Sequence, residues 1–345
     1  MSAIRVGLYD HPAFREHDAG PGHPERPARL DAARRGIREA GLEPRVQILT
    51  PSPAGREELR AVHTAGHIDR VAATEGRTHR FDPDTQAGPR SYAAALLAAG
   101  SVVDAVDRVL AGSLDRAFCA VRPPGHHAEA DRAMGFCLFN NVAVGAARAL
   151  AAGALRVAVV DFDVHHGNGT QDIFYDDPRV LYVSTHAYPF YPGTGALDEV
   201  GEGSGQGYTV NLPLPGTMGD AEYARIYREL VEPVLLAFDP GLLLVSAGFD
   251  PHRDDPLAGM AVTERGFAAI AQCCLDGASG SAKGRAVFVL EGGYDLDGIA
   301  ESTAAVMRVL LGETVEAGLD AAPRIDRLIG LFRQHHGQYW PSLAP

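Results

Sequence analysis

The 345-residue sequence lacks several features that mark whole classes of protein. It has four cysteines, and none of them forms a CxxC pair of the kind that binds zinc or cycles a disulfide. Its apolar runs are broken after a few residues, so no segment approaches the roughly 20 residues of a membrane-spanning helix. The first residues, MSAIRVGLYDH, lack the basic and then apolar pattern of a secretory signal. We therefore expect a cytoplasmic chain with reduced thiols and no membrane partner.

Positive charge is also scarce, because 31 Lys and Arg face 44 Asp and Glu, for a net charge of -13. A broad basic face for nucleic acid is therefore not expected. The composition of a disordered chain is absent as well, since 46% of the residues are hydrophobic. No linker, repeat or low-complexity tract divides the sequence, and we expect a single domain over residues 1–345.

Short apolar segments rich in β-branched residues alternate with amphipathic, alanine-rich stretches. The expected strands are Arg5–Tyr9, Arg116–Val121, Val157–Asp163, Val180–Thr185, Leu242–Gly248 and Ala286–Glu291. The expected helices are Pro27–Ala40, Ser91–Leu110, Asn140–Ala152, Asp220–Phe238, Thr263–Leu275 and Gly298–Leu310, with a further helix and a tail within 312–345. This alternation predicts an α/β fold in which helices cover both faces of a mainly parallel sheet.

Ligands bind at the carboxyl ends of the strands in such sheets, so polar residues there carry the most information. One expected strand runs into DFDVHHGNGTQ (161–171). Side chains alternate along a strand, which would place Asp161, Asp163 and His165 on one face. Burying this row is costly unless a positive charge compensates it, and a divalent cation bound by Asp163 and His165 would do so. The alternative is that these residues cap the following helix.

A second strand end carries AGFDPHRDD (247–255), in which Asp250 leaves the expected strand. On its own, Asp250 is typical of a turn or a helix cap. Together with Asp163 and His165 it would complete a set of three ligands. Three protein ligands leave a position open for water, which distinguishes a catalytic zinc site from a structural one.

Two further strand ends carry groups suited to acid–base and oxyanion chemistry. RPPGHHAE (122–129) presents His126 and His127 after a Pro-Pro-Gly bend, although paired histidines can also occupy a solvated turn. EGGYDL (291–296) presents Tyr294, whose phenol would donate to a developing oxyanion unless its hydroxyl lies in water. The four strand ends together supply the groups needed for metal-assisted amide hydrolysis.

These stretches resemble the histone deacetylase superfamily, which includes acetylpolyamine amidohydrolases and acetoin-utilisation proteins. The class II branch and its bacterial relatives are the most similar. The matching motifs are GHPERPARL (22–30), RPPGHHAE (122–129), GFCLFNNVAVGA (135–146), VDFDVHHGNGTQDIFY (160–175), YVSTH (182–186), YPGTG (191–195), GYTVNLPL (207–214), AGFDPHRDDPL (247–257) and LEGGY (290–294). The resemblance implies an arginase-like deacetylase fold with a central, mainly parallel sheet.

The resemblance also implies roles for individual residues. Asp163, His165 and Asp250 would bind one zinc ion, although a carboxylate-rich site also accepts iron or cobalt. Tyr294 would polarise the amide carbonyl, and His127 would act first as general base and then as general acid. The remaining residues of the implied catalytic set are His126, which tunes the local charge, Asp161, which partners it, and Asn168, which stands where class I enzymes have an aspartate.

Structural potassium ions are implied as well. The first potassium site would use the backbone carbonyls of Asp161, Asp163, His165 and Thr185 and the hydroxyl of Ser184. The second would use the carbonyls of Phe174, Asp177, Val180 and Tyr208.

An acyl-lysine channel is implied with Phe136 and Tyr191 as its walls. The family usually has phenylalanine at the second position. Leu257 matches a gatekeeper position at which leucine accompanies acyl-lysine substrates and glutamate accompanies cationic polyamines. Arg26 is similar to an arginine beneath the catalytic floor, and packing at the start of the following helix explains it equally well.

Three functions follow from these residues. The first is zinc-dependent hydrolysis of acyl-lysine in proteins or peptides. The second is deacetylation of a small acetylated amine such as an acetylpolyamine, against which Leu257 argues. The third is a catalytically silent module that binds acyl-lysine or metal, which should have lost Tyr294, a histidine or a metal ligand, whereas all of them are present.

Overall fold

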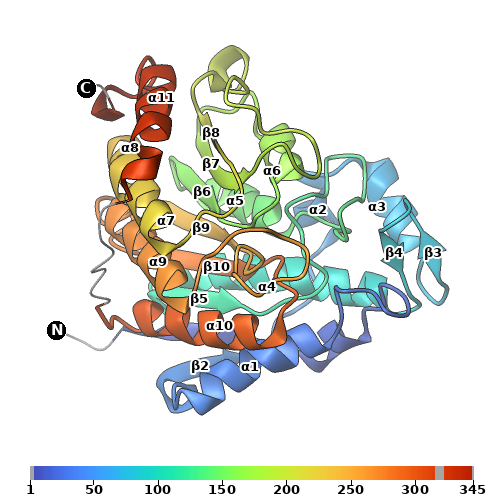
Figure 1. Cartoon of the computed structure of the whole chain (residues 1–345). Helices are drawn as coiled ribbons and strands as arrows, with labels where there is room; N and C mark the ends of the chain where they lie inside the picture. The colour runs from blue at the N-terminus through green and yellow to red at the C-terminus, as the bar shows by residue number, and fades with distance from the viewer. Residues whose placement is uncertain (1–3, 315–321, 344–345) are drawn as a thin grey trace.

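The computed structural model describes residues 4–314 and 322–343. Its centre is a sheet in which every neighbouring pair of strands is parallel (Figure 1). In spatial order the strands are β2 (Val46–Leu49), β1 (Val6–Tyr9), β5 (Arg116–Cys119), β10 (Ala286–Leu290), β9 (Leu242–Ala247), β6 (Val157–Asp161), β7 (Val180–Ala187) and β8 (Thr209–Leu214). The predicted α/β class and parallel sheet are confirmed.

All six strands expected from the sequence form, and they occupy the middle of the sheet. The two strands of this sheet that were not expected, β2 and β8, lie at its edges. The edge strand β2 is half exposed, and β8 contains Asn211 and Pro213, so neither has the continuous apolar run of a buried parallel strand. A small antiparallel pair, β3 (His79–Arg80) and β4 (Gln86–Ala87), lies apart from the main sheet.

Helices cover both faces of the sheet. On one face, α4 (Ser91–Leu110) and α5 (Asn141–Ala151) pack on each other and on the central strands. On the other, α10 (Leu296–Leu310) lies between α1 (Ala28–Glu39) and α9 (Glu264–Gly277) (Figure 1). The remaining helices are α2 (Arg56–Arg60), α3 (Ala65–Ala72), α6 (Asn168–Ile173), α7 (Asp220–Ile226), α8 (Glu232–Phe238) and α11 (Asp326–His336).

Two helical segments differ in detail from the helices expected from the sequence. The expected helix Asp220–Phe238 is continuous, but a π-helical turn at Tyr227–Val231 separates α7 from α8. The expected C-terminal helix is α11, while residues 315–321 and 344–345 lie outside the described residues. After α11, Trp340 Nε1 donates to the Gly207 carbonyl at 2.9 Å, which holds the segment against the rest of the domain.

Close helix packing depends on small residues at particular places. A Cβ atom at Gly36 of α1 would overlap the carbonyl of Ala300 in α10, so glycine lets these helices approach each other directly. The central strands are buried along their whole length, as in β9, where all six residues are buried. Each buried Val or Leu side chain contributes about 1.5–3 kcal/mol relative to exposure, so these strands form the main core.

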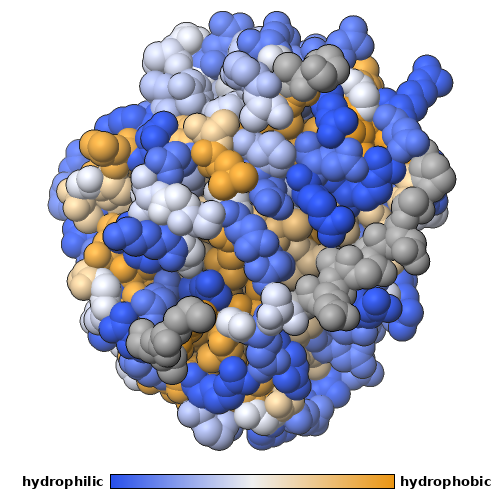
Figure 2. All heavy atoms as spheres, turned by 90° about the vertical axis from the view of Figure 1, so that its left-hand side faces the viewer, coloured by the Kyte–Doolittle hydropathy of each residue, from blue (hydrophilic) through white to orange (hydrophobic). Residues whose placement is uncertain are grey.

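The outer surface is mixed in character. Figure 2 shows the face at the left of Figure 1, where hydrophilic side chains surround small hydrophobic patches. Among residues 4–314 and 322–343, no helix is both long and apolar enough to cross a membrane.

The sheet order brings the chemically interesting strand ends together. Strands β5, β10, β9 and β6 are adjacent, and each is followed by one of the four polar motifs. Because their carboxyl ends meet at one edge of a parallel sheet, the motifs converge there.

Candidate active site

The three expected metal ligands lie together at this edge. Single ligand atoms of Asp163, His165 and Asp250 all fall within 4.8 Å of one another. His165 Nδ1 is 3.0 Å from Asp163 Oδ1 and 3.1 Å from Asp250 Oδ2. Both carboxylates are buried, and the His165 side chain is 12% exposed. The arrangement provides an imidazole nitrogen and carboxylate oxygens around one point, which fits a divalent cation such as zinc.

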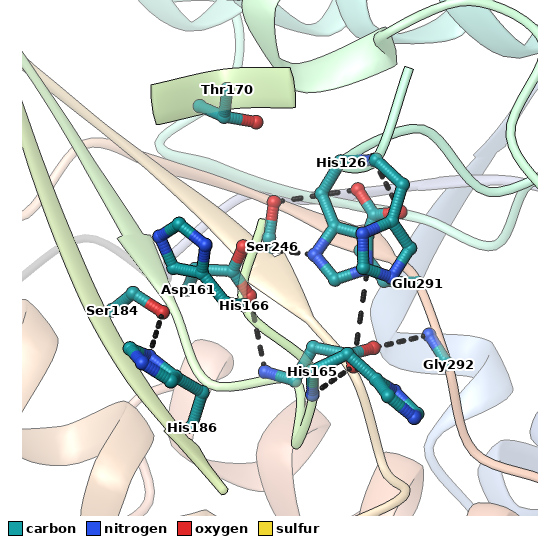
Figure 3. A network of polar contacts seen from close by, with 12 residues as sticks. His126, Asp161, His165, His166, Thr170, Ser184, His186, Ser246, Glu291 and Gly292 are labelled. Atoms are coloured by element: carbon teal, nitrogen blue, oxygen red, sulfur yellow. Dashed lines mark hydrogen bonds and ion pairs between the residues drawn. The ribbon is translucent and has the colours of Figure 1, made fainter. Parts of the chain in front are cut away.

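Backbone amides orient both carboxylates. The backbone nitrogen of Gly292, which is labelled in Figure 3, donates to Asp163 Oδ2 at 2.7 Å. Val164 N donates to Asp250 Oδ1 at 2.8 Å. In each carboxylate the other oxygen faces His165. The strand ends thus hold the ligand oxygens in place before any ion binds.

The buried carboxylates of Asp163 and Asp250 require a positive charge nearby. Burial, together with repulsion from Asp163, raises the pKa of Asp250 to about 7. Although burial disfavours an imidazolium, hydrogen bonds to Asp163 and Asp250 raise the pKa of His165 to about 10. Two buried carboxylates this close cannot both remain ionised without a nearby cation. A bound metal would supply that charge directly and release the proton from His165.

Asp161 lies beside the three ligands, but its carboxylate contacts His126. Its Oδ2 is 3.0 Å from His126 Nδ1 and accepts a hydrogen bond from Tyr182 Oη at 3.2 Å. Its Oδ1 accepts from Asp163 N at 3.1 Å. The expected strand through Asp163 is therefore too long, because β6 ends at Asp161 and the chain turns there. The turn directs Asp161 to His126 while Asp163 joins His165 and Asp250.

His126 is held in a negative environment. Besides the bond to Asp161, its Nε2 is 3.9 Å from Asp163 Oδ1. Burial opposes its charge, but Asp161 and Asp163 raise the pKa of His126 to about 10. The backbone amides of Gly125 and His126 donate to Glu291 Oε2 at 2.6 and 3.2 Å, which fixes the bend before the two histidines (Figure 3).

His127 has an amide partner instead of a carboxylate. Its Nδ1 is 2.8 Å from Asn168 Oδ1. Asn168 Nδ2 donates to Glu129 Oε1 at 2.8 Å, so the amide oxygen is the atom that faces His127. This orientation makes His127 Nδ1 the protonated nitrogen and leaves the lone pair on Nε2. Burial, with repulsion from His126 and His165, holds the pKa of His127 well below its usual range.

Tyr294 stands across the site from the histidines. Its backbone N–H donates to Asp255 Oδ2 at 2.7 Å, and the Arg29 guanidinium carbon lies 5.0 Å from its ring centre. Burial raises the pKa of Tyr294 well above its usual value, against the opposing effect of Arg29. The phenol therefore stays protonated and can donate a hydrogen bond.

Of these groups, His126, His127, His165 and Tyr294 line a cavity of about 240 Å³. The residues around it are Asp84, Pro124, His126, His127, Gly135, Phe136, His165, Tyr191, Leu257, Gly292 and Tyr294. All three residues expected in the substrate channel, Phe136, Tyr191 and Leu257, are among them. Asp84 was not expected, because it lies in the turn between β3 and β4 rather than after a strand of the main sheet.

Aromatic rings form much of the cavity wall. Tyr191 meets the His127 ring edge-on at 5.1 Å, and Phe136 meets Tyr294 edge-on at 6.1 Å. Next to this lining, Phe190 stacks on His165 at 5.3 Å and is 40% exposed. Phe136 adopts a φ of 69°, which is uncommon for a residue with a side chain and indicates a backbone shaped to present this ring.

A buried set of charged side chains lies beneath the catalytic residues. The interpretation that placed Arg26 there is wrong. Arg26 is exposed, whereas Arg29, three residues later, is fully buried beneath Tyr294. Arg29 Nε donates to the Gly293 carbonyl at 2.5 Å, and Arg29 Nη1 is 3.1 Å from Glu25 Oε1. Arg122 also pairs with Glu25. Glu25 precedes α1, which begins at Ala28, so helical periodicity did not mark this pair in the sequence.

The residues proposed for potassium lie in two groups near β6 and β7. Asp161 and Ser184 are paired across these strands, and Ser184 Oγ is 2.9 Å from His186 Nδ1. At the second group, the carbonyls of Phe174, Asp177 and Tyr208 each accept one backbone hydrogen bond. A carbonyl oxygen has a second lone pair that remains available to a cation.

Comparisons with known proteins agree with this geometry. The model of the histone deacetylase domain family matches residues 23–310. The chain belongs to the histone deacetylase family. The sequence is similar to histone deacetylase 15 of Arabidopsis thaliana, with 44% identity over 332 residues that cover 93% of this chain and 59% of the relative. It is also similar to a probable deacetylase of Archaeoglobus fulgidus, with 41% identity over 295 residues that cover 85% of this chain and 82% of the relative.

The fold of this family member is shared with a solved relative. The crystal structure of the HDA15 HD domain superposes with a TM-score of 0.91 at 40% identity, covering 99% of this chain and 97% of the other. The chain spans less than two thirds of histone deacetylases 15 and 5 of Arabidopsis thaliana, at 59% and 54% of their lengths. The fold and the deacetylase hydrolase family are thus established.

Proposed function

We propose that the chain is a zinc-dependent deacetylase that hydrolyses the acyl amide of acyl-lysine in proteins or peptides. We further propose that residues 1–345 form one catalytic domain. The observation that carries the proposal is one cavity that presents His165 of the metal-ligand group, His127 and Tyr294 to the same space. A metal site, a base and a phenol facing one space are the parts of a metal-assisted amide hydrolase.

The proposed zinc site consists of Asp163, His165 and Asp250. Their short separations, burial and backbone-held carboxylates fit a divalent cation with an open position for water. When bound, such an ion polarises the substrate carbonyl and lowers the pKa of a coordinated water toward about 7.

We assign proton transfer to His127. Its Nδ1–H donates to Asn168, so Nε2 carries the lone pair and is the nitrogen that accepts the proton of the attacking water. The lowered pKa of His127 keeps this base unprotonated before the reaction. Once protonated, the same nitrogen gives its proton to the departing amine, which is a poor leaving group without it.

We assign carbonyl activation to Tyr294. Its phenol remains protonated at neutral pH because burial raises its pKa. It can therefore donate a hydrogen bond to the acyl oxygen as negative charge develops there. Arg29 and Asp255 hold this tyrosine from below and from the backbone side.

The channel explains why an acylated amine would be preferred to a free one. Phe136, Tyr191 and Leu257 line the cavity with largely apolar surface. A free lysine would bring an ammonium group into this space and lose its hydration, whereas an acyl amide carries no net charge. The hydroxyl of Tyr191, at a position where relatives usually have phenylalanine, is proposed to influence the acyl group accepted.

Two structural potassium ions are part of the proposal. The first would bind at Asp161, Asp163, His165, Ser184 and Thr185, and the second at Phe174, Asp177, Val180 and Tyr208. The carbonyls of Phe174, Asp177 and Tyr208 each already accept a backbone hydrogen bond, so a potassium ion at this site would use their second lone pairs.

A small acetylated amine is the alternative substrate, and one residue favours it. Asp84 brings a carboxylate to the lining of the cavity, where it would attract a cationic polyamine. Leu257 argues the other way, because it adds no negative charge to the wall.

The test is a panel of acetyl-lysine peptides, longer acyl-lysine peptides and N-acetylputrescine, assayed with and without a chelator. We expect the highest kcat/KM on an acyl-lysine peptide and loss of the reaction when the chelator removes the metal. A higher kcat/KM on N-acetylputrescine than on the peptides would show that the substrate is a small acetylated amine and not acyl-lysine. Full activity of chelator-treated, metal-free protein would contradict zinc dependence.

A further inference from the structure

A second group of metal-binding side chains lies outside the active site. Ligand atoms of His252, Glu264 and Glu301 fall within 4.8 Å of one another. His252 belongs to the loop after β9, Glu264 begins α9, and Glu301 lies within α10. Helices α9 and α10 pack side by side, so the cluster joins three separate segments (Figure 1).

The two helices fix the imidazole of His252. One face of its ring is parallel to Phe267 of α9, at an angle of 11° and a centroid distance of 6.5 Å. On the α10 side, a Cβ at Gly298 would lie 2.6 Å from His252 Nδ1, so glycine gives the ring its space. Glu264 precedes Phe267 by three residues and Glu301 follows Gly298 by three. Each carboxylate therefore lies one helical turn from a residue that positions the ring.

The two nitrogens of His252 differ in their surroundings. Nδ1 accepts a long hydrogen bond from the backbone N–H of Asp254 at 3.3 Å and lies 3.8 Å from the Asp254 carboxylate. A metal at Nε2 would place the ring proton on Nδ1, where that carboxylate can accept it. Nε2 is buried and has no hydrogen-bond partner among residues 4–314 and 322–343. The side chain as a whole is 3% exposed. A buried ring nitrogen without a partner is uncommon in folded proteins and indicates that a ligand completes it.

The neighbouring positive charge is already paired. Arg35 of α1 lies near Glu301, but its guanidinium is 2.6 Å from Asp297. Glu264 is half-buried and Glu301 is exposed, so the cluster has a buried imidazole at its base and carboxylates toward solvent. A cation entering from the solvent side would meet all three groups.

We propose that His252 Nε2, Glu264 and Glu301 form a second divalent-metal site, which takes Zn²⁺ in preference to Mg²⁺ or Ca²⁺. An imidazole nitrogen with two carboxylate oxygens suits zinc, whereas magnesium and calcium prefer oxygen ligands alone. The three ligands leave positions for water on the exposed side. An ion here ties the loop that carries Asp250 and Leu257 to α9 and α10, and binding only to the folded chain raises its thermal stability.

The experiment starts from protein whose active site is already loaded with one equivalent of zinc. Equilibrium dialysis against rising Zn²⁺, with metal counted by mass spectrometry, gives the number of ions bound. We expect a second equivalent in the wild type, together with a rise in Tm. Glu264→Gln and Glu301→Gln preserve side-chain size and should each weaken the second binding step by roughly tenfold or more. Both variants should keep the first equivalent and the wild-type deacetylase rate.

Glu75→Gln is the matched control, because Glu75 is exposed and lies outside the cluster. It should bind the second ion as the wild type does, and Mg²⁺ should not displace that ion. Saturation of the wild type at one equivalent would overturn the proposal. Equal second-site affinity in Glu264→Gln, Glu301→Gln and the wild type would also overturn it, by showing that the additional ion is adventitious.

Discussion

His126 and His127 are neighbours in the chain, and their ring centroids are 4.0 Å apart, yet their pKa values are shifted in opposite directions. Against the cost of burial, Asp161 and Asp163 raise the pKa of His126 to about 10. Burial and the positive charge of His126 hold the pKa of His127 well below its usual value, with Asn168 as its neutral partner. The partner residue, rather than the position in the loop, decides which histidine is available as a base.

Because of this difference, the two histidines have separate roles in the site. His126 provides fixed positive charge beside the metal-binding carboxylates and in turn suppresses protonation of His127. His127 is left with a free Nε2 toward the cavity. The predictions below test that division, beginning with the changes that should remove activity altogether.

Removing either carboxylate of the proposed metal site should have the largest effect. Asp163→Ala and Asp250→Ala each delete one of three ligands and leave the remaining buried charges unbalanced, so we expect loss of bound zinc and a deacetylase rate at background. Elemental analysis alongside an acetyl-lysine assay measures both. Stoichiometric zinc retained in both variants would refute the ligand set.

The two histidines should differ when each is replaced. His127→Ala removes the proton-transfer group, and we expect a loss of roughly 10²–10⁴-fold in kcat. His126→Ala removes supporting charge and should cost less. Circular dichroism and zinc content serve as controls for folding. A larger loss for His126→Ala would reverse the assignment of the base.

Tyr294→Phe should remove the phenol and leave the histidines unchanged. We expect kcat to fall by roughly 10²–10³-fold, because one preorganised donor to the oxyanion is lost. Folding, zinc content and the midpoint of the acid limb of the pH–rate profile should match the wild type. A variant at the full rate would show that the phenol has no part in the reaction.

Asn168→Asp should make His127 resemble His126. A carboxylate beside Nδ1 favours the imidazolium and should raise the pKa of His127 by about 1–3 units. A base with a raised pKa stays protonated to higher pH, so the acid limb of kcat/KM should move upward and the rate below that limb should fall. The matched control is Glu75→Gln, an exposed acid outside the site, whose acid limb should match that of the wild type. An unchanged acid limb in Asn168→Asp would show that residue 168 does not set the pKa of His127.

The sequence predicts the site to the extent that its residues follow strands. Asp163, His165, Asp250 and Tyr294 each come shortly after an apolar run, and parallel strands bring their carboxyl ends to one edge. The central strands were predictable for the same reason, since burial on both faces requires uninterrupted apolar residues. Edge strands β2 and β8 have one partner each, and their sequences carry a weaker signal.

What the sequence does not predict depends on tertiary contacts between distant segments. Glu129 orients Asn168 across 39 residues of chain, and Glu25 pairs with Arg122 across 97. The strand alternation that grouped Asp161 with Asp163 and His165 fails because the chain turns after Asp161. Asp84 reaches the cavity from a turn outside the main sheet, and no local pattern marks it.

The central claim is that one ion at Asp163, His165 and Asp250 enables hydrolysis by His127 and Tyr294. The most direct measurement is the deacetylase rate on an acetyl-lysine peptide as zinc is returned to chelator-treated protein. We predict no activity without metal, a rise in proportion to the first equivalent bound, and no such rise in Asp250→Ala. Full activity in metal-free wild type, or restoration of Asp250→Ala by one equivalent, would contradict it.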